Sequence, residues 1–243
     1  MNRKLVLVSA LGALFSAGSA NALIIDDFTV RQPDITLNGP SPQSSASMLT
    51  PGPTSNIIGG WRQTDVTMYS GGVGAKTEVR VLANDVLDIS NTVSAQSRTI
   101  LTWNASNSAL GLGNLDLNVP GTNGIFVAFP IAMDHPLDLI FEIEDYGNST
   151  AKISKTFPAL SQGTDFFFSF SDFTNKNALA SADSIRMTID STTPGLDATV
   201  DLVESRDTPP GTIPEPATMG LLCFGLLGLG LGLRRWKAKA RNA

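Results

Sequence analysis

The sequence predicts an all-β fold, an antiparallel β-sandwich, for the part of the chain that lies between its two ends. Apolar and polar residues alternate along several short segments, most cleanly over 185–190 and 196–202, as in strands with one buried face. Clusters of Gly, Asn, Pro and Ser separate several of these segments, and no long stretch between the ends has the 3.6-residue period of an amphipathic helix. Many short strands that each have one apolar face are best buried in two packed sheets.

The alternation places strands along most of a domain that we expect to span residues 23–205. The segment 33–55 interrupts the pattern with five prolines and repeated serines, and it is predicted to be a long loop. Residues 206–213, with Pro209-Pro210-Gly211, are predicted to be a linker. Strands are expected at 23–30, 57–69, 77–82, 98–103, 115–119, 124–131, 137–144, 150–157, 165–170, 185–190 and 196–202.

Composition excludes several classes of protein. A length of 243 residues with 42% hydrophobic and 16% charged residues is inconsistent with a wholly disordered chain. One Cys excludes an intramolecular disulfide, and one Cys with one His excludes a Cys/His zinc site. Because 22 acidic residues outnumber 17 basic ones, nucleic acid is not an expected partner.

The first 22 residues have the order of a secretory signal peptide. Arg3 and Lys4 precede an apolar run of 11 residues over 5–15, and small residues then lead to Ala20-Asn21-Ala22, an A-x-A pattern. We therefore expect cleavage after Ala22 and export of the following domain.

The C-terminal end has the properties of a membrane anchor. Residues 217–233 contain no charge, and a helix of these 17 residues would be about 25 Å long, at the lower limit for a bilayer core of about 30 Å. A basic tail in the cytoplasm fits the positive-inside rule and leaves the domain outside. The tail consists of Arg234, Arg235, Lys237, Lys239 and Arg241.

Pro214-Glu215-Pro216 stands directly before this span, where two prolines keep the segment extended and accessible. Together with the Gly/Leu-rich span and the basic tail, the tripeptide resembles the PEP-CTERM sorting signal of exopolysaccharide-producing Gram-negative bacteria, here over 214–243. The resemblance implies recognition by an exosortase-type enzyme, a transient membrane anchor, and delivery to the cell surface or the extracellular matrix.

Short motifs in the domain resemble jelly-roll ectodomains that are often found ahead of this sorting signal. They are Ile24-Ile25-Asp26-Asp27-Phe28, Ile58-Gly59-Gly60-Trp61-Arg62, and the segments 182–187 and 196–201. Such domains are similar to carbohydrate-binding modules and galactose-binding-like sandwiches. The resemblance implies a jelly-roll-like sandwich and allows a structural calcium ion, with oxygen ligands from Asp26, Asp27, Asp197 and Asp201. No other cofactor is expected.

The sequence contains no complete catalytic constellation. His135 is the only imidazole and is predicted to lie in a loop, no G-x-S-x-G elbow accompanies it, and Cys223 lies in the predicted span. Glu142 and Glu144 share one strand face with α-carbons about 6.5–7 Å apart, a spacing that a glycosidase can use, although acids on an outer face are usually only solvated.

Exposed aromatic rings would be needed to stack on sugars, and Trp61, Trp103, Tyr69 and Tyr146 are the candidates, with core packing as the alternative for the tryptophans. The sequence therefore predicts an exported, non-enzymatic surface or matrix protein that is structural or associates with exopolysaccharide. Two alternatives stay open: a matrix glycan-active enzyme using carboxylates, and a permanently anchored surface protein.

Overall fold

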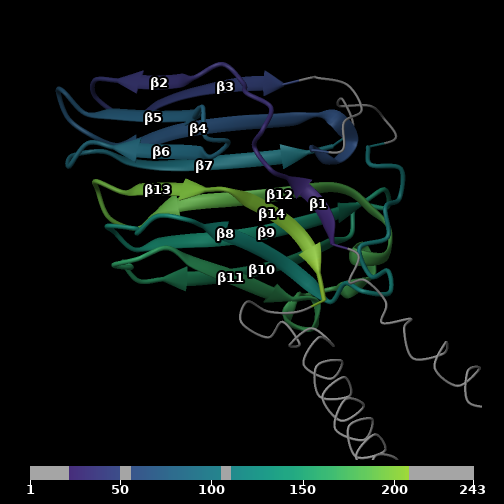
Figure 1. Ribbon diagram of the computed structural model, residues 1–243. Helices are drawn as coiled ribbons and strands as arrows, with labels where there is room; N and C mark the ends of the chain where they lie inside the picture. Colours follow the sequence, from purple (N-terminus) through teal and green to yellow (C-terminus); the bar gives the residue numbers. More distant parts are fainter. Residues whose placement is uncertain (1–21, 50–55, 105–110, 208–243) are drawn as a thin grey trace, which may run out of the picture. The chain divides into compact units, whose positions relative to one another are not determined.

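A computed structural model describes residues 22–49, 56–104 and 111–207, and these residues form the predicted antiparallel β-sandwich (Figure 1). Helical structure in this part of the chain is limited to three short 3-10 turns, η2 (Ile58–Gly60), η4 (Phe170–Asp172) and η5 (Lys176–Ala180). The strands are β1 (Leu23–Asp26), β2 (Ile35–Asn38), β3 (Gln43–Leu49), β4 (Arg62–Ser70), β5 (Lys76–Val81), β6 (Leu87–Asn91), β7 (Gln96–Trp103), β8 (Gly124–Phe129), β9 (Leu137–Asp145), β10 (Thr150–Phe157), β11 (Thr164–Ser169), β12 (Ala182–Ser191), β13 (Asp197–Val200) and β14 (Leu202–Arg206).

One layer of the sandwich is a six-stranded sheet with the order β10-β9-β12-β7-β4-β3. Facing it are two four-stranded sheets, β1-β14-β8-β11 and β13-β6-β5-β2. The chain passes from one four-stranded sheet to the other at Asp201, so the single strand predicted over 196–202 is in fact β13 followed by β14.

The prediction of a loop over 33–55 is wrong for much of that segment, because β2 pairs with β5 and β3 pairs with β4. The prolines delimit these strands and do not interrupt them. Pro33 precedes β2, while Pro40 and Pro42 lie in the turn that joins β2 to β3. Segment 33–55 therefore contains two strands, and neither of them includes a proline.

The strand predicted at 115–119 is also absent, and only one isolated bridge joins Leu115 to Ala182. Leu117 is fully buried, and its backbone N–H donates to the carbonyl of Leu179 in η5. Leu115 and Leu117 alternate with polar residues because their side chains pack on the core from a connecting segment that is not a strand. Conversely, no strand is predicted from the sequence at β6, although Leu87 and Ile89 both point into the core and the residue between them does not.

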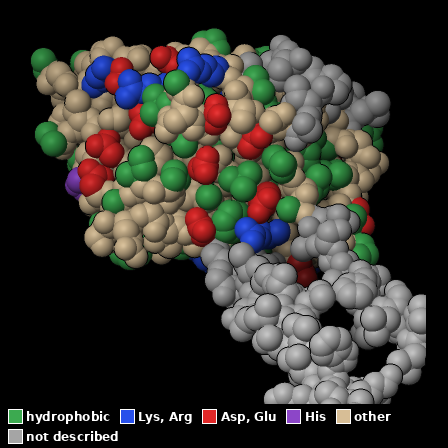
Figure 2. All heavy atoms as spheres, viewed as in Figure 1, with side chains coloured by type: hydrophobic (Ala, Val, Ile, Leu, Met, Phe, Trp, Pro, Cys, Tyr) green, Lys and Arg blue, Asp and Glu red, His purple; other side chains and the backbone are tan. Residues whose placement is uncertain are grey.

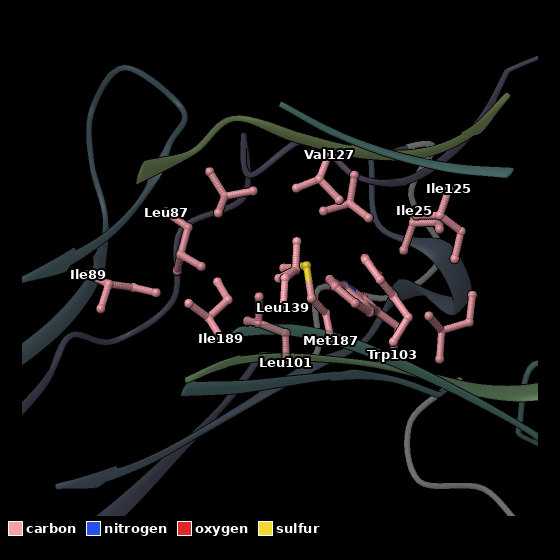
Figure 3. Packing of buried hydrophobic residues seen from close by; sticks show 14 of the residues in the cluster. Ile25, Leu87, Ile89, Leu101, Trp103, Ile125, Val127, Leu139, Met187 and Ile189 are labelled. Atoms are coloured by element: carbon pink, nitrogen blue, oxygen red, sulfur yellow. The ribbon is translucent and has the colours of Figure 1, made fainter. Parts of the chain in front are cut away.

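The core lies between the two layers (Figure 3). Leu101, Leu139 and Met187 of the six-stranded sheet point toward Leu87 and Val127 of the facing sheets, and all five are fully buried. Burial of one such side chain stabilises the fold by about 1.5–3 kcal/mol relative to exposure. This packing fixes which face of each strand points outward.

A buried ion pair crosses the sandwich near the end of β1. Asp26 and Arg62 are both fully buried, and Arg62 Nη1 lies 2.7 Å from Asp26 Oδ2 and 2.8 Å from Oδ1. Asp26 also accepts hydrogen bonds from the indole Nε1–H of Trp103 at 2.7 Å and from the backbone N–H of Phe28 at 2.9 Å. Burial raises the pKa of Asp26, and Arg62, Trp103 and the Phe28 N–H act against that rise.

The other two nitrogens of Arg62 also donate hydrogen bonds. Its Nε–H donates to Gln32 Oε1 at 2.7 Å, and Nη2 donates to the carbonyl oxygen of Val30 at 2.8 Å. The guanidinium carbon lies 5.1 Å from the ring centroid of Phe28, within the range of a cation–π contact. The ion pair therefore links β1, the segment after it, β4 and β7.

The two ends of the chain lie outside the described residues, and so do the predicted signal peptide, the sorting tripeptide, the span 217–233 and the basic tail. Among the residues that are described, no helix is long and apolar enough to cross a membrane. Residues 23–213 include 10 basic and 21 acidic residues, a net charge of −11 (10 − 21). Figure 2 shows acidic side chains spread over the visible face, with basic side chains gathered mainly along one side.

Replacing Arg62 by Met is expected to lower the free energy of unfolding by about 3–5 kcal/mol, because Asp26 would be left as an uncompensated buried charge. Chemical denaturation followed by tryptophan fluorescence measures this loss. The matched control is Arg98→Met, which removes an arginine whose side chain is 50% exposed in its ion pair and should cost at most about 1 kcal/mol. Equal losses for the two variants would contradict a central role for the buried pair.

Candidate functional site

Both tryptophans that were candidates for sugar contact are core residues. Trp61 is 2% exposed and Trp103 is 0% exposed, and the indole N–H of Trp103 is bound to Asp26. Trp103 is on the inward phase of β7, as Leu101 is, so its ring packs between the layers. The prediction that these two residues contact a ligand is wrong, and the alternative of core packing is correct.

The two candidate tyrosines are exposed but are not brought together. Tyr69 is 41% exposed on the outward phase of β4, and Tyr146 is 68% exposed in the turn between β9 and β10. The strands β12 and β7 separate β9 from β4 in the sheet. The two rings therefore belong to different parts of the surface.

The four aspartates proposed as calcium ligands do not form one site. The Asp26 carboxylate is occupied by Arg62 and Trp103, while Asp27 accepts hydrogen bonds from Thr29 and Asn56. Within the described residues, no group of three or more His, Cys, Asp or Glu side chains is placed to hold a metal ion. Partial burial raises the pKa of Asp201, and the nearby carboxylates of Asp85, Asp165 and Asp27 raise it further.

The outer face of the six-stranded sheet contains a depression of about 370 Å³ beside Tyr69. Its lining comes from β4, β7 and β12, whose outward residues meet here because the strands are paired in register. The Tyr69 hydroxyl donates to Asp190 Oδ1 at 2.8 Å and contacts the carbonyl oxygen of Ser191, which fixes the ring on the sheet. The lining residues are Thr67, Tyr69, Arg98, Ile100 and Asp190.

The charges in this depression are paired with each other. Arg98 Nη2 lies 2.6 Å from Asp190 Oδ2, and its Nε–H donates to the same oxygen at 2.9 Å. Burial is the main cause that raises the pKa of Tyr69, and the hydrogen bond to Asp190 adds to it. The site therefore offers a neutral phenol ring, a compensated ion pair and an apolar floor from Ile100.

A row of uncharged residues runs from this depression across the middle of the same face. The strand register aligns Ile100 with Thr188, Thr188 with Ile140, and Ile140 with Ser154. Both isoleucines lie on the solvent side and are partly exposed, whereas Thr188 between them is only 6% exposed. Two residues along the strands, Arg186 and Glu142 form a parallel charged row on the same face, with Lys152 next to Glu142.

A second, smaller depression of about 70 Å³ lies on this charged row and contains Glu142 and Glu144, the carboxylates considered for catalysis. Lys152 Nζ lies 2.8 Å from Glu142 Oε1, and this contact, opposed by partial burial and aided by Arg186, lowers the pKa of Glu142. A glycosidase acid needs the opposite shift, because it must keep its proton near neutral pH. Glu142 is therefore poorly suited to act as a general acid.

His135 lies in the segment between β8 and β9, as predicted, with Nδ1 3.0 Å from Asp134 Oδ1. Asp134 Oδ1 also accepts the backbone N–H of Asp197 at the start of β13. These contacts hold Asp134 and His135 against the start of β13.

Sequence reasoning missed most residues of the outer face, including Arg98, Ile100, Asp190 and Arg186. The sequence does contain one indication of this surface. Ile100 and Ile140 occupy outward positions of their strands, where a solvated face usually has polar residues. The register that aligns these positions depends on pairing between strands far apart in sequence, and no local pattern gives it.

Comparison with known proteins identifies a sorting signal. Residues 212–235 match the PEP-CTERM protein-sorting motif, in agreement with the resemblance seen in the sequence. The chain is thus a β-sandwich protein followed by a PEP-CTERM motif. No curated protein matches it at the level of sequence.

Solved structures with a similar strand arrangement include carbohydrate-binding modules. The family 11 module of the cellulase Lic26A-Cel5E of Clostridium thermocellum is 11% identical, with a TM-score of 0.40 over 78% of this chain and 96% of that one. The family 30 module of a Clostridium thermocellum cellulase is 12% identical, with a TM-score of 0.36 over 73% and 99%. An exo-β-agarase is 12% identical, with a TM-score of 0.42 over 79% of this chain and 26% of the enzyme. These likenesses concern the arrangement of strands and identify no ligand.

The phenol of Tyr69 is expected to ionise at a higher pH than an ordinary tyrosine, whose pKa is about 10, because it is partly buried and bonded to Asp190. In a Tyr146→Phe background Tyr69 is the only tyrosine, and its ionisation is followed by near-ultraviolet absorbance. Asp190→Asn should lower this pKa by removing the negative charge. Thr67→Val, a change in the same depression without loss of charge, is the control, and an unchanged pKa in Asp190→Asn would contradict the described contact.

Proposed function

We propose that this protein is exported, processed at its C-terminus by an exosortase-type enzyme, and associates with a polysaccharide through the outer face of its six-stranded sheet. The observation that carries the binding proposal is the row of Ile100, Thr188 and Ile140 that leads to the Tyr69 depression. Apolar side chains and a fixed aromatic ring contact the C–H faces of sugars, and polar groups on both sides bond to the hydroxyls.

The charges around this row favour a neutral polysaccharide. Arg98 is paired with Asp190, and Arg186 and Lys152 both contact Glu142. Glu144 lines the same depression as Arg186, so three acids balance the three bases and leave no excess of positive charge to attract an anionic chain. The exported part as a whole has a net charge of −11 (10 − 21), which repels anionic polymers. Hydrogen bonds to hydroxyl groups do not depend on this net charge.

The sorting motif supports the proposed route to the cell surface. β14 ends at Arg206 and the matched motif begins at residue 212, so a short segment separates the sandwich from the motif. The apolar span and the basic tail would hold the chain in the inner membrane with the sandwich outside until processing occurs. The polysaccharide matrix outside the cell is then the place where the sheet meets its ligand.

Ile140→Asp is expected to weaken binding to a neutral polysaccharide roughly tenfold, the equivalent of about 1.4 kcal/mol, because a charge replaces an apolar contact. Affinity electrophoresis through gels with soluble neutral glucans or galactans measures the change, with alginate as the anionic comparison. Val73→Asp is the matched control, since Val73 is 96% exposed in the turn between β4 and β5. No retardation by any neutral polysaccharide, or equal effects of the two variants, would contradict the binding proposal.

Glu215→Ala is expected to prevent processing, so that the variant accumulates in the inner membrane while the wild type is released to the surface or medium. Cell fractionation with immunoblotting measures the distribution. Asp207→Ala removes an acid close to the motif but outside it and should behave as the wild type does. Identical retention of wild type and Glu215→Ala in the membrane would favour permanent anchoring instead.

A further inference from the structure

The six-stranded sheet has a free edge at β3. β3 is paired along its length with β4, and it has no strand on its other side in the described part of the chain. Ser44, Ser45 and Ala46 are all exposed, although successive side chains of a strand point to opposite faces, so neither face of β3 is covered there. An edge strand of this kind presents unpaired backbone N–H and C=O groups.

The opposite edge of the same sheet is closed. The backbone N–H of Thr174 donates to the carbonyl of Lys152 in β10 at 3.0 Å, and the N–H of Lys152 donates to Thr174 Oγ1 at 3.1 Å. The segment between β11 and β12 therefore supplies hydrogen bonds to β10 that a further strand would otherwise make. Lys152 and Lys155 add charge to this edge, which disfavours pairing with another sheet.

The edges of the two four-stranded sheets are occupied or short. Lys155 Nζ donates to the Phe167 carbonyl of β11, and Ile57 forms a bridge with Asp26 at β1. The Asp197 N–H at the start of β13 donates to Asp134, and β2 has only four residues. Of the sheet edges in the described part of the chain, β3 alone is both long and without such protection.

The sequence of β3 suits pairing with a copy of itself. Its seven residues contain no charge and no proline, and its register with β4 is unbroken from Gln43 to Leu49. An exported domain with a net charge of −11 (10 − 21) would repel its own copies over most surfaces, but not along this strand. Antiparallel pairing centred on Ala46 would place Ser45 of one copy opposite Ser47 of the other. Ser47 Oγ is shielded from solvent and has no hydrogen-bond partner within the described residues.

We propose that β3 is a self-association edge, through which two copies of this chain pair antiparallel and join their six-stranded sheets into one continuous sheet. The contact is isologous, because the same strand is used by both copies around a two-fold axis. Backbone hydrogen bonds supply the attraction, as in other cases where a strand is added to an open sheet edge. The outer faces of the two sheets would then lie side by side on one surface.

Cysteine cross-linking of the full chain tests this pairing. The single native cysteine is removed by Cys223→Ser, and Ser44→Cys, Ser45→Cys, Ala46→Cys and Ser47→Cys are made one at a time in that background. After mild oxidation of the detergent-purified protein, non-reducing electrophoresis is expected to show a disulfide-linked dimer, strongest at the position nearest the two-fold axis. Ser154→Cys, at an exposed position on the closed edge β10, is the matched control and should give only a trace of dimer.

Dimer from the β3 positions no greater than that from Ser154→Cys would overturn the proposal, and so would equal dimer at all four β3 positions, which indicates random collision. A second variant, Ser45→Lys, changes an exposed position and places two positive charges, one from each copy, diagonally across the two-fold axis on the same face of the joined sheet. It should convert the dimer to monomer in sedimentation velocity. A wild type that sediments as a monomer at all concentrations would also overturn the proposal, whatever the outcome of the polysaccharide binding test.

Discussion

The buried ion pair between Asp26 and Arg62 is the interaction on which the geometry of this sandwich depends. Asp26 ends the first strand in one layer, whereas Arg62 begins β4 in the other, and Trp103 at the end of β7 donates to the same carboxylate. A charge without water must have its full set of partners, so the layers can meet in only one alignment at this end. Arg62 and Trp103 are also register partners on β4 and β7, so their shared contact with Asp26 supports the register that brings the outward residues of these strands together in the candidate site.

The two faces of the six-stranded sheet have different roles, because one is buried in the core and the other is exposed to solvent. Its inner face is filled by large apolar side chains, so specificity toward other molecules has to come from the outer face and from the edges. On the outer face nearly every charge has a partner within the sheet, and the exposed apolar atoms lie in one row between charged rows. The edge strand β3 adds an uncharged border to this face. Recognition of a ligand and contact with a second copy would thus use neighbouring parts of one surface.

The alternation of apolar and polar residues predicted most strands and the sandwich itself, because the period of two directly reports a half-buried strand. It failed where local sequence and tertiary pairing disagree. β2 and β3 were hidden by prolines that only mark their ends, and Leu117 alternates with its neighbours because it is buried from a connecting segment. The site was predicted poorly for a related reason: Asp26 and Trp103 have the residue types of a ligand site, but a distant arginine and the inward phase of β7 assign them to the core.

If the chain is exported as proposed, the pairing of the first strand with the last has a consequence for the order of events. β14 lies between β1 and β8, with Leu23 opposite Ser205, so an inner strand of this sheet would be the last part of the sandwich to be translocated. Until that strand emerges, β1 has no strand beside it in its sheet. In that route the domain would close only after almost the whole chain had crossed the membrane, when the sorting motif itself arrives there. Completion of the tertiary structure and presentation of the motif would thus be coupled in time by the strand order.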